Sequence, residues 1–356
     1  MIKKELLKYK LAPQTKLYDV MQARWRPFLM FNQDSNLRSR VCNTDVYGLR
    51  FNNLKNKNRQ NSIFDEIGKS KKIGVLLGNS MAFGEGASED KMTITSQLSK
   101  ISNYHFLNFC GRGFSGMQEI INYLLLSHKL KNVKNFLIIS GLNDSFLPFY
   151  VPQSECDSYQ LPILGYKLFN KHMQNASTGW KKKMLQKIIN FFFKGKINIH
   201  SLNRLNLFEQ LLIKKSFLKI KEKDPYKRLD EMIKRNFFIL STISKFLNVK
   251  IDFILQPVGS WCEKKRSPEE KKLFNEENQI PQLSEIYSHV NRKKYLLVKK
   301  IIQRETKKYK MRFFDLNEFL NQKKFDNKWF FVSNFHVNDE CNRIIAKEIK
   351  RKFLRK

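Results

Sequence analysis

The chain has 356 residues, 42% of them hydrophobic, so it can bury a core, and its length fits two domains or one domain with a large insertion. Lys and Arg outnumber Asp and Glu by 67 to 32, and the formal net charge of +35 favours anionic partners without saying which. Five widely spaced cysteines without a C-x-x-C pair argue against a disulfide framework and against a structural zinc site.

The first 70 residues are irregular, with an aromatic cluster, RWRPFLMF, and a polar break, NNLKNKNRQN. We expect residues 1–70 to form an N-terminal extension packed on the main domain. Their start is basic but lacks the apolar segment of a secretory signal, and no window of the chain approaches the roughly 20 apolar residues of a membrane span. The sequence therefore predicts a cytoplasmic protein and leaves peripheral attachment to a membrane open.

Apolar runs typical of buried strands then alternate with helical patterns. The runs predict strands at 73–77, 104–109, 136–139, 251–255 and 311–316. Helices are expected at 93–100, around 117–125, from the N-cap pair Asp224-Pro225, near 283–308, and after the N-cap Asn338. This alternation predicts an α/β domain with a mostly parallel five-stranded sheet, built from residues 71–144 and 225–356.

Residues 145–224 interrupt this pattern with lysines interleaved among large apolar residues, as in GWKKKMLQKIINFFFKGK. We expect a basic helical insertion that caps the domain. Such a segment is typical of a surface that lies on anionic lipid or binds an acidic glycan. It is also typical of a helical lid whose apolar side packs on the core and whose lysines are solvated.

Three predicted strand ends carry polar or glycine-rich residues, namely Gly78-Asn79-Ser80, residues 110–113 and residues 141–144. Ligands bind at the carboxyl ends of the strands in open parallel sheets. A serine on such a turn is exposed beside backbone N–H groups, so a nucleophile and an oxyanion site can share one place. The alternative is a phosphate-binding loop, but the segment around Ser80 contains neither of the patterns typical of one, G-x-x-x-x-G-K-[ST] and G-x-G-x-x-G.

A serine nucleophile needs a base, and six histidines are available. His336 lies between an aromatic run, FFVSNF, and the final helix, where a loop should reach the same edge of the sheet as Ser80. His105 falls within a predicted strand and His128 at a helix end, which favours structural roles for both.

These blocks, in this order, resemble the SGNH (GDSL-type) hydrolases. Gly78-Asn79-Ser80 resembles the nucleophile turn of the family, NFCGRGFSGMQEI its second block, GLND its third, and SNFHVND its D-x-x-H block. The resemblance implies a flavodoxin-like three-layer α/β/α fold, Ser80 as nucleophile and His336 as base. It also implies an oxyanion hole from Ser80, Gly113 and Asn143, and no metal or other cofactor. Two further stretches, NTDVYGLRF and LQPV with SPEEKK, resemble the subgroup found in bacterial surface-polysaccharide clusters.

Two residues depart from the family pattern. Asn79 replaces the aspartate beside the nucleophile, and Ser333 stands where an aspartate would orient the imidazole and stabilise its protonated form. Three outcomes stay open: a Ser–His dyad with a backbone carbonyl as orienter, another carboxylate such as Asp144 or Asp339 in that role, or a degenerate site. The side chains considered as orienters of His336 are Ser333, Asp144 and Asp339.

The function expected from these residues is a serine esterase or deacylase, with an O-acylated glycan or a small ester as substrate. An O-acyltransferase would use the same residues, and a binding protein that has kept the fold without the chemistry is the alternative outside catalysis. Nucleic-acid binding rests on charge alone, because no recognised motif accompanies it.

Overall fold

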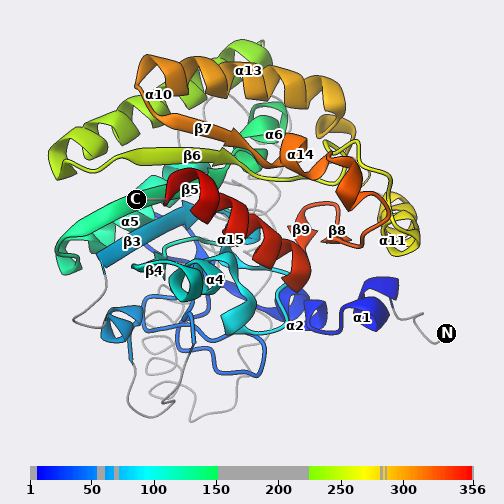
Figure 1. The fold of residues 1–356 in the computed structure, drawn as a ribbon, viewed down its shortest axis with the longest axis horizontal. Coiled ribbons are helices and arrows are strands. Elements are labelled where there is room, and N and C mark those ends of the chain that lie inside the picture. Colours follow the sequence, from blue (N-terminus) through cyan, green and yellow to red (C-terminus); the bar gives the residue numbers. More distant parts are fainter. Residues whose placement is uncertain are drawn as a thin grey trace, which may run out of the picture.

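The computed structural model describes residues 6–53, 61–67, 72–150, 224–280, 284 and 287–354. Its centre is one sheet in the order β4-β3-β5-β6-β7, in which every neighbouring pair is parallel (Figure 1). The strands are β3 (Lys72–Gly78), β4 (Tyr104–Asn108), β5 (Val133–Ser140), β6 (Ile251–Leu255) and β7 (Arg312–Asp315). Since β3 is the first strand of this sheet along the chain, the order reads 2-1-3-4-5, which is the flavodoxin-like arrangement. The predicted fold class is therefore confirmed.

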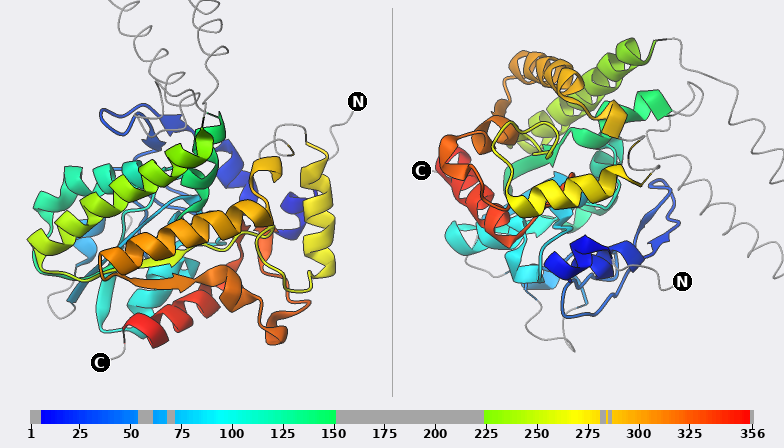
Figure 2. Two further views of the ribbon diagram at one scale, coloured as in Figure 1. Left: turned by 90° about the horizontal axis from the view of Figure 1, so that it is seen from above. Right: turned by 90° about the vertical axis from the view of Figure 1, so that its right-hand side faces the viewer.

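Helices cover both faces of the sheet (Figure 2). On one face lie α5 (Gly116–Leu126), α10 (Pro225–Leu247) and α13 (Arg292–Lys308), with α6 (Leu142–Tyr150) packed against the last two. The other face carries α4 (Ile94–Ile101) and α15 (Asp339–Phe353). Shorter elements form the connections: α3 (Ser80–Phe83), α11 (Pro268–Asn278), α14 (Leu316–Leu320), η1 (Ile63–Glu66), η2 (Asp90–Met92), η3 (Ser127–Lys129), η5 (Lys323–Phe325), and a hairpin of β8 (Phe331–Ser333) and β9 (His336–Val337).

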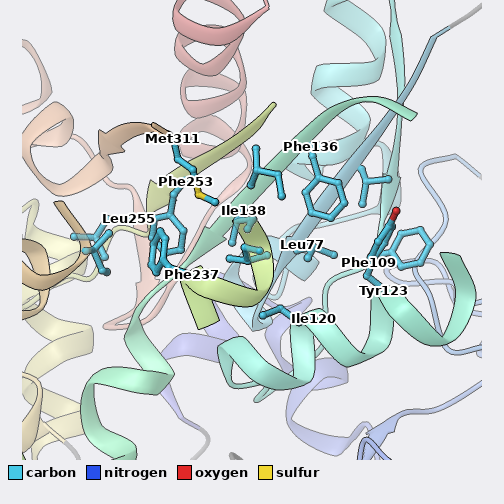
Figure 3. Packing of buried hydrophobic residues seen from close by; sticks show 14 of the residues in the cluster. Leu77, Phe109, Ile120, Tyr123, Phe136, Ile138, Phe237, Phe253, Leu255 and Met311 are labelled. Atoms are coloured by element: carbon cyan, nitrogen blue, oxygen red, sulfur yellow. The ribbon is translucent and has the colours of Figure 1, made fainter. Parts of the chain in front are cut away.

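The strands are apolar on both sides because both sides are covered. On β3, Val75 and Leu77 pack in the cluster under α5 and α10, whereas Leu76 packs in the cluster under α4 and α15. Figure 3 shows the first cluster, in which Ile138 of β5 and Phe253 of β6 continue the layer of Leu77. Full burial of such a side chain contributes about 1.5–3 kcal/mol to the stability of the fold. Because residues on both sides of the central strands are buried, these strands are specified by continuous apolar runs and not by alternating ones.

The helix starts follow their capping residues. Asp224 accepts from the backbone N of Lys227 at 2.9 Å ahead of Pro225, and Asn338 accepts from the backbone N of Cys341 at 3.0 Å, as their sequence predicts. The helix expected near 283–308 starts at Arg292, behind the N-cap Asn291. α11 was not predicted, although a complete capping box at Ser267 begins it.

The N-terminal residues lie against the β4 edge of the sheet and against its carboxyl end. They form α1 (Leu7–Leu11), α2 (Thr15–Val20) and the ribbon of β1 (Ala23–Arg24) with β2 (Asn32–Gln33). Arg50 pairs with Asn108 at the end of β4, and its fully buried guanidinium donates to Asp90 at 2.9 Å and to the Tyr18 hydroxyl at 2.9 Å. This buried ion pair ties residues from α2 to the connection after β3.

Most of the expected insertion, residues 151–223, lies outside the described residues. Its predicted start at residue 145 falls inside α6, which continues to Tyr150. Among the residues that are described, no helix combines the length and the apolar character needed to cross a bilayer. The four cysteines in these ranges, Cys42, Cys110, Cys262 and Cys341, are buried and free.

Candidate active site

A tight turn at the end of β3 presents Ser80. A side chain on Gly78 would come within 2.4 Å of the carbonyl oxygen of Ile139, so only glycine fits where β3 meets β5. Asn79 caps α3 by accepting from the backbone N of Met81 at 3.2 Å, and its amide also donates to Gln256 at the end of β6. An aspartate could cap the helix but could not donate to that oxygen, which gives Asn79 a local role of its own.

The hairpin of β8 and β9 brings His336 to this turn from the far end of the chain. His336 Nε2 lies 2.9 Å from Ser80 Oγ, across 256 residues of sequence. Two hydrogen bonds hold the turn of this hairpin in place. Gly259 N donates to the carbonyl of Asn334 at 2.7 Å, and Asn334 N donates to Glu277 at 3.0 Å. The structure thus places the proposed nucleophile and base in direct contact.

Ser333 occupies the second nitrogen of the same imidazole. Its Oγ lies 2.9 Å from His336 Nδ1 and also accepts from the backbone N of Phe335 and of His336, at 3.3 and 3.2 Å. The two carboxylates considered as orienters lie elsewhere. Asp144 accepts from Gly116 N at 2.9 Å and from Asn236, whereas Asp339 accepts from Ser88 N at 2.9 Å. Of the three candidates, only Ser333 contacts the ring.

Hydrogen bonds fix two parts of the chain that are expected to hold an oxyanion. Gly111 N donates to Gly78 O at 3.0 Å, which fastens the loop containing Gly113 to the nucleophile turn. Asn143 Nδ2 donates to the carbonyl of Phe114 at 2.6 Å, one residue beyond Gly113. Within the described part of the chain, the backbone N–H groups of Ser80 and Gly113 have no hydrogen-bond partner. Both N–H groups are therefore free to donate to a ligand, as the predicted oxyanion hole requires.

A carboxylate that the sequence analysis missed lies beside the base. Glu85 Oε2 is 3.8 Å from His336 Nε2 and 3.0 Å from Arg112 Nε. Gly84 and Gly86 flank it with φ of +94° and +104°, and a side chain on Gly86 would come within 2.6 Å of the carbonyl of Val337, so β9 lies directly on this turn. Its position five residues after Ser80, between two glycines, was the signal that could have found it.

Burial and charge set the protonation of this group. Burial lowers the pKa of His336 below its ordinary value of 6.5, while Glu85 opposes this shift and Arg112 and Lys8 add to it. Burial acts to raise the pKa of Glu85, but His336 and Arg112 outweigh it and hold that pKa below the usual range. At neutral pH the imidazole is therefore neutral and able to accept a proton, next to an ionised carboxylate.

A cavity of about 150 Å³ adjoins His336. Its walls come from four parts of the chain: α1 and α2, the turn at Glu85, the segment at Glu277 and Tyr287, and the hairpin with Ser333 and Phe335. The N-terminal contribution consists of Lys8, Thr15, Tyr18 and Asp19, none of which the sequence analysis had connected with the site. The described residues contain no cluster of three or more His, Cys, Asp or Glu side chains that could hold a metal ion.

No family model and no curated protein matches the chain. Among solved structures, it is similar to a lipolytic protein of the G-D-S-L family from Veillonella parvula, with 10% identity, a TM-score of 0.42, and coverage of 80% of this chain and 100% of that one. A lipase/acylhydrolase from Enterococcus faecalis has 10% identity and a TM-score of 0.38, with 79% and 96% covered. A GDSL-like lipase from Bacteroides thetaiotaomicron has 12% identity and a TM-score of 0.39, with 81% and 92% covered.

Proposed function

We propose that the chain is a serine ester hydrolase that removes an acyl group from an alcohol through an acyl-enzyme on Ser80. The observation that carries the proposal is the 2.9 Å contact between Ser80 Oγ and His336 Nε2. The uncommitted backbone N–H groups of Ser80 and Gly113 support it. A binding protein without chemistry has no need for this combination.

Attack on the ester begins with proton transfer. The Ser80 hydroxyl donates to Nε2 of the neutral His336, and the proton moves to Nε2 as Oγ bonds to the carbonyl carbon. The carbonyl oxygen becomes an oxyanion held by the N–H groups of Ser80 and Gly113 and by Asn143. The amide of Asn143 has two hydrogens, so the one bound to the carbonyl of Phe114 leaves the other for the oxyanion.

Collapse of the tetrahedral intermediate returns the proton. Nε2–H donates it to the oxygen of the departing alcohol, and a water molecule then repeats the sequence to release the carboxylic acid and restore Ser80. During both halves the imidazolium is stabilised by the Glu85 carboxylate, 3.8 Å from Nε2, while Nδ1–H donates to Ser333 Oγ.

The acceptor decides between two reactions at the same residues. Water gives an esterase or deacylase, whereas a sugar hydroxyl gives an O-acyltransferase. We favour hydrolysis of an O-acyl ester, with an O-acylated glycan as the substrate that the cavity beside His336 suits best. The resemblance to proteins of surface-polysaccharide clusters agrees with that choice and remains a prediction.

The test is covalent labelling of the intact protein with a fluorophosphonate probe, which reacts with activated serines. Wild type should be labelled, and Ser80→Ala and His336→Ala should not. Ser88→Ala is the matched control, because the Ser88 hydroxyl hydrogen-bonds to Asp339 and not to His336, and this variant should be labelled as wild type is. Equal labelling of wild type and Ser80→Ala, or absence of labelling from all variants, would overturn the proposal.

A further inference from the structure

The cavity beside His336 lies where the alcohol part of an ester has to lie. His336 Nε2 must reach the leaving oxygen to protonate it, so the group attached to that oxygen projects from the Nε2 side of the ring. Glu85, 3.8 Å from Nε2, lines the cavity together with His336. The alcohol therefore leaves the reaction centre next to this space.

The charges around the cavity nearly cancel in pairs. Glu85 is paired with Arg112 at 3.0 Å, and Asp19 forms an ion pair with Lys8. Glu277 is the remaining acid, and burial raises its pKa while it accepts from the Tyr287 hydroxyl at 2.7 Å. The cavity is thus close to neutral, in contrast with the +35 of the whole chain.

The same groups leave hydrogen-bond acceptors available. Glu85 contacts Arg112 and His336 through Oε2 alone. Glu277 likewise accepts from Tyr287 and Asn334 through Oε2 alone. Within the described ranges, the Oε1 atom of each glutamate therefore has no hydrogen-bond partner. A carboxylate oxygen is an acceptor only, so it suits a hydroxyl donor and disfavours a second anion. Three aromatic residues, Tyr18, Tyr287 and Phe335, also line the cavity and add apolar surface to its walls.

The volume of the cavity further restricts which ligands it can hold. About 10–15 Å³ of this kind of space is the least that holds one water molecule, so 150 Å³ has room for a group much larger than water, such as one sugar ring. A long acyl chain would bury the acids beside it without hydrogen bonds, which is costly.

We propose that this cavity is a binding subsite for one uncharged, hydroxyl-rich ring, the sugar that carries the ester, and that α1 and α2 of the N-terminal segment form its outer wall. The proposal rests on the proposed ester hydrolysis, since it assigns the alcohol side of that reaction. The proposal also implies that the net charge of the chain does not determine which sugar binds, because the subsite selects a neutral sugar and the basic surface takes no part in the selection.

The experiment uses full-length Ser80→Ala, which cannot turn over, and ligand-observed NMR titration. The probes are methyl glycosides of glucose, galactose, mannose and N-acetylglucosamine, with glucuronate as the anionic analogue, glucosamine as the cationic one, and cyclohexanol as the apolar one. At least one neutral glycoside should bind, and each of the other three probes should bind at least about tenfold more weakly. The proposal is overturned if no neutral glycoside binds, or if the anion, the amine or cyclohexanol binds as well as the best glycoside.

A substitution locates the binding. Asp19→Leu removes an acceptor from the cavity wall and should weaken glycoside binding about tenfold, the order expected for a hydrogen bond to a charged group. Asp230→Leu is the matched control, because Asp230 is also a partly exposed aspartate paired with a lysine, but it lies on α10. Equal effects of the two substitutions, or none from Asp19→Leu, would contradict the assignment.

Two results would distinguish failure of the sugar subsite from failure of the proposed esterase activity. Fluorophosphonate labelling of wild type without any glycoside binding would leave the esterase standing and remove the sugar subsite. Glycoside binding that is sensitive to Asp19→Leu, without labelling of Ser80, would leave a sugar-binding site and remove the esterase.

Discussion

Ser333 Oγ lies 2.9 Å from His336 Nδ1, on the side of the imidazole opposite Ser80. A hydroxyl can donate to Nδ1 as well as accept from it, whereas a carboxylate only accepts. Base catalysis needs the tautomer with the proton on Nδ1, so that Nε2 is free to accept from Ser80. Ser333 Oγ already accepts from two backbone N–H groups. Its own hydroxyl hydrogen can therefore be donated to Nδ1, which favours the other tautomer, with the proton on Nε2. The site therefore holds the productive tautomer less firmly than an aspartate would.

Replacing this hydroxyl by a carboxylate should help. Ser333→Asp fixes the proton on Nδ1 and stabilises the imidazolium, so kcat should rise with little change in KM, because the new charge acts in the transition state. Loss of that carboxylate in a Ser–His–Asp enzyme costs ~10⁴ in kcat, and we expect roughly tenfold or more to be recovered here. The measurement is steady-state hydrolysis of one short-chain p-nitrophenyl ester.

Ser333→Asn is the matched control, since it has the size of aspartate without its charge, and it should not raise kcat. Alanine at Asp144 or Asp339 should leave the pH dependence of kcat unchanged, because neither contacts His336. Loss of activity in Ser333→Asp with full activity in Ser333→Asn would contradict the tautomer argument.

Glu85 offers a second test of how the imidazolium is stabilised. Glu85→Gln keeps the shape of the side chain and removes the charge 3.8 Å from Nε2, so kcat should fall roughly tenfold. Glu89→Gln changes a nearby glutamate that is paired with Lys91 on the surface and should have no effect on kcat. If both variants match wild type, Glu85 has no part in the reaction.

The pH dependence of kcat/KM gives the sign of these electrostatic effects. The neutral imidazole is the active form, so the rate should fall as the pH drops through the pKa of His336, which burial places below 6.5. Glu85 raises that pKa and Arg112 lowers it. The acidic limb of the profile should therefore move to lower pH in Glu85→Gln and to higher pH in Arg112→Gln. A shift of both variants in one direction would refute this assignment.

Local sequence signals account for the framework and for Ser80. The apolar runs of β3, β5 and β6 are long enough to read as buried strands, and Gly78 marks the turn that carries the nucleophile. The position of His336 followed from the rule that the carboxyl ends of parallel strands share one edge of the sheet. These inferences need only short-range patterns and the handedness of strand connections.

Contacts between distant segments could not be inferred in that way. Neither the pairing of Arg50 with Asp90 nor the approach of Lys8 and Asp19 to the cavity beside His336 leaves a periodic pattern in the sequence. A charged residue such as Arg50 predicts exposure by its type, and its complete burial depends on partners from α2 and from the connection after β3.

That buried pair should dominate the stability of the N-terminal region. Arg50→Ala leaves Asp90 buried without its cation, a change that costs about 3–5 kcal/mol in comparable cases. Thermal unfolding should show a large drop in Tm. Arg351→Ala breaks the exposed pair with Glu348 and should change Tm little or not at all. Similar Tm values for the two variants would show that residues 6–53 contribute little to the folded core.

Asn143 provides the last test, because the chain contains a close structural match for it. Asn143 Nδ2 donates to the carbonyl of Phe114 at 2.6 Å, and Asn122 Nδ2 donates to the carbonyl of Phe109 at 2.9 Å, so both are buried amides that hold the connection between β4 and α5. Alanine at either position leaves a buried carbonyl unpaired and should cost stability by a similar amount, about 1–3 kcal/mol.

The proposed mechanism directs the second amide hydrogen of Asn143 to the oxyanion and gives Asn122 no such role. Asn143→Ala should therefore lower kcat by ~10²–10³ with little change in KM, whereas Asn122→Ala should keep kcat within a few-fold of wild type at a temperature where both variants are folded. Circular dichroism establishes that temperature, and hydrolysis of one ester gives the rates. If the two variants lose activity in parallel with their stability, Asn143 is a structural residue and the oxyanion hole consists of the Ser80 and Gly113 backbone N–H groups alone.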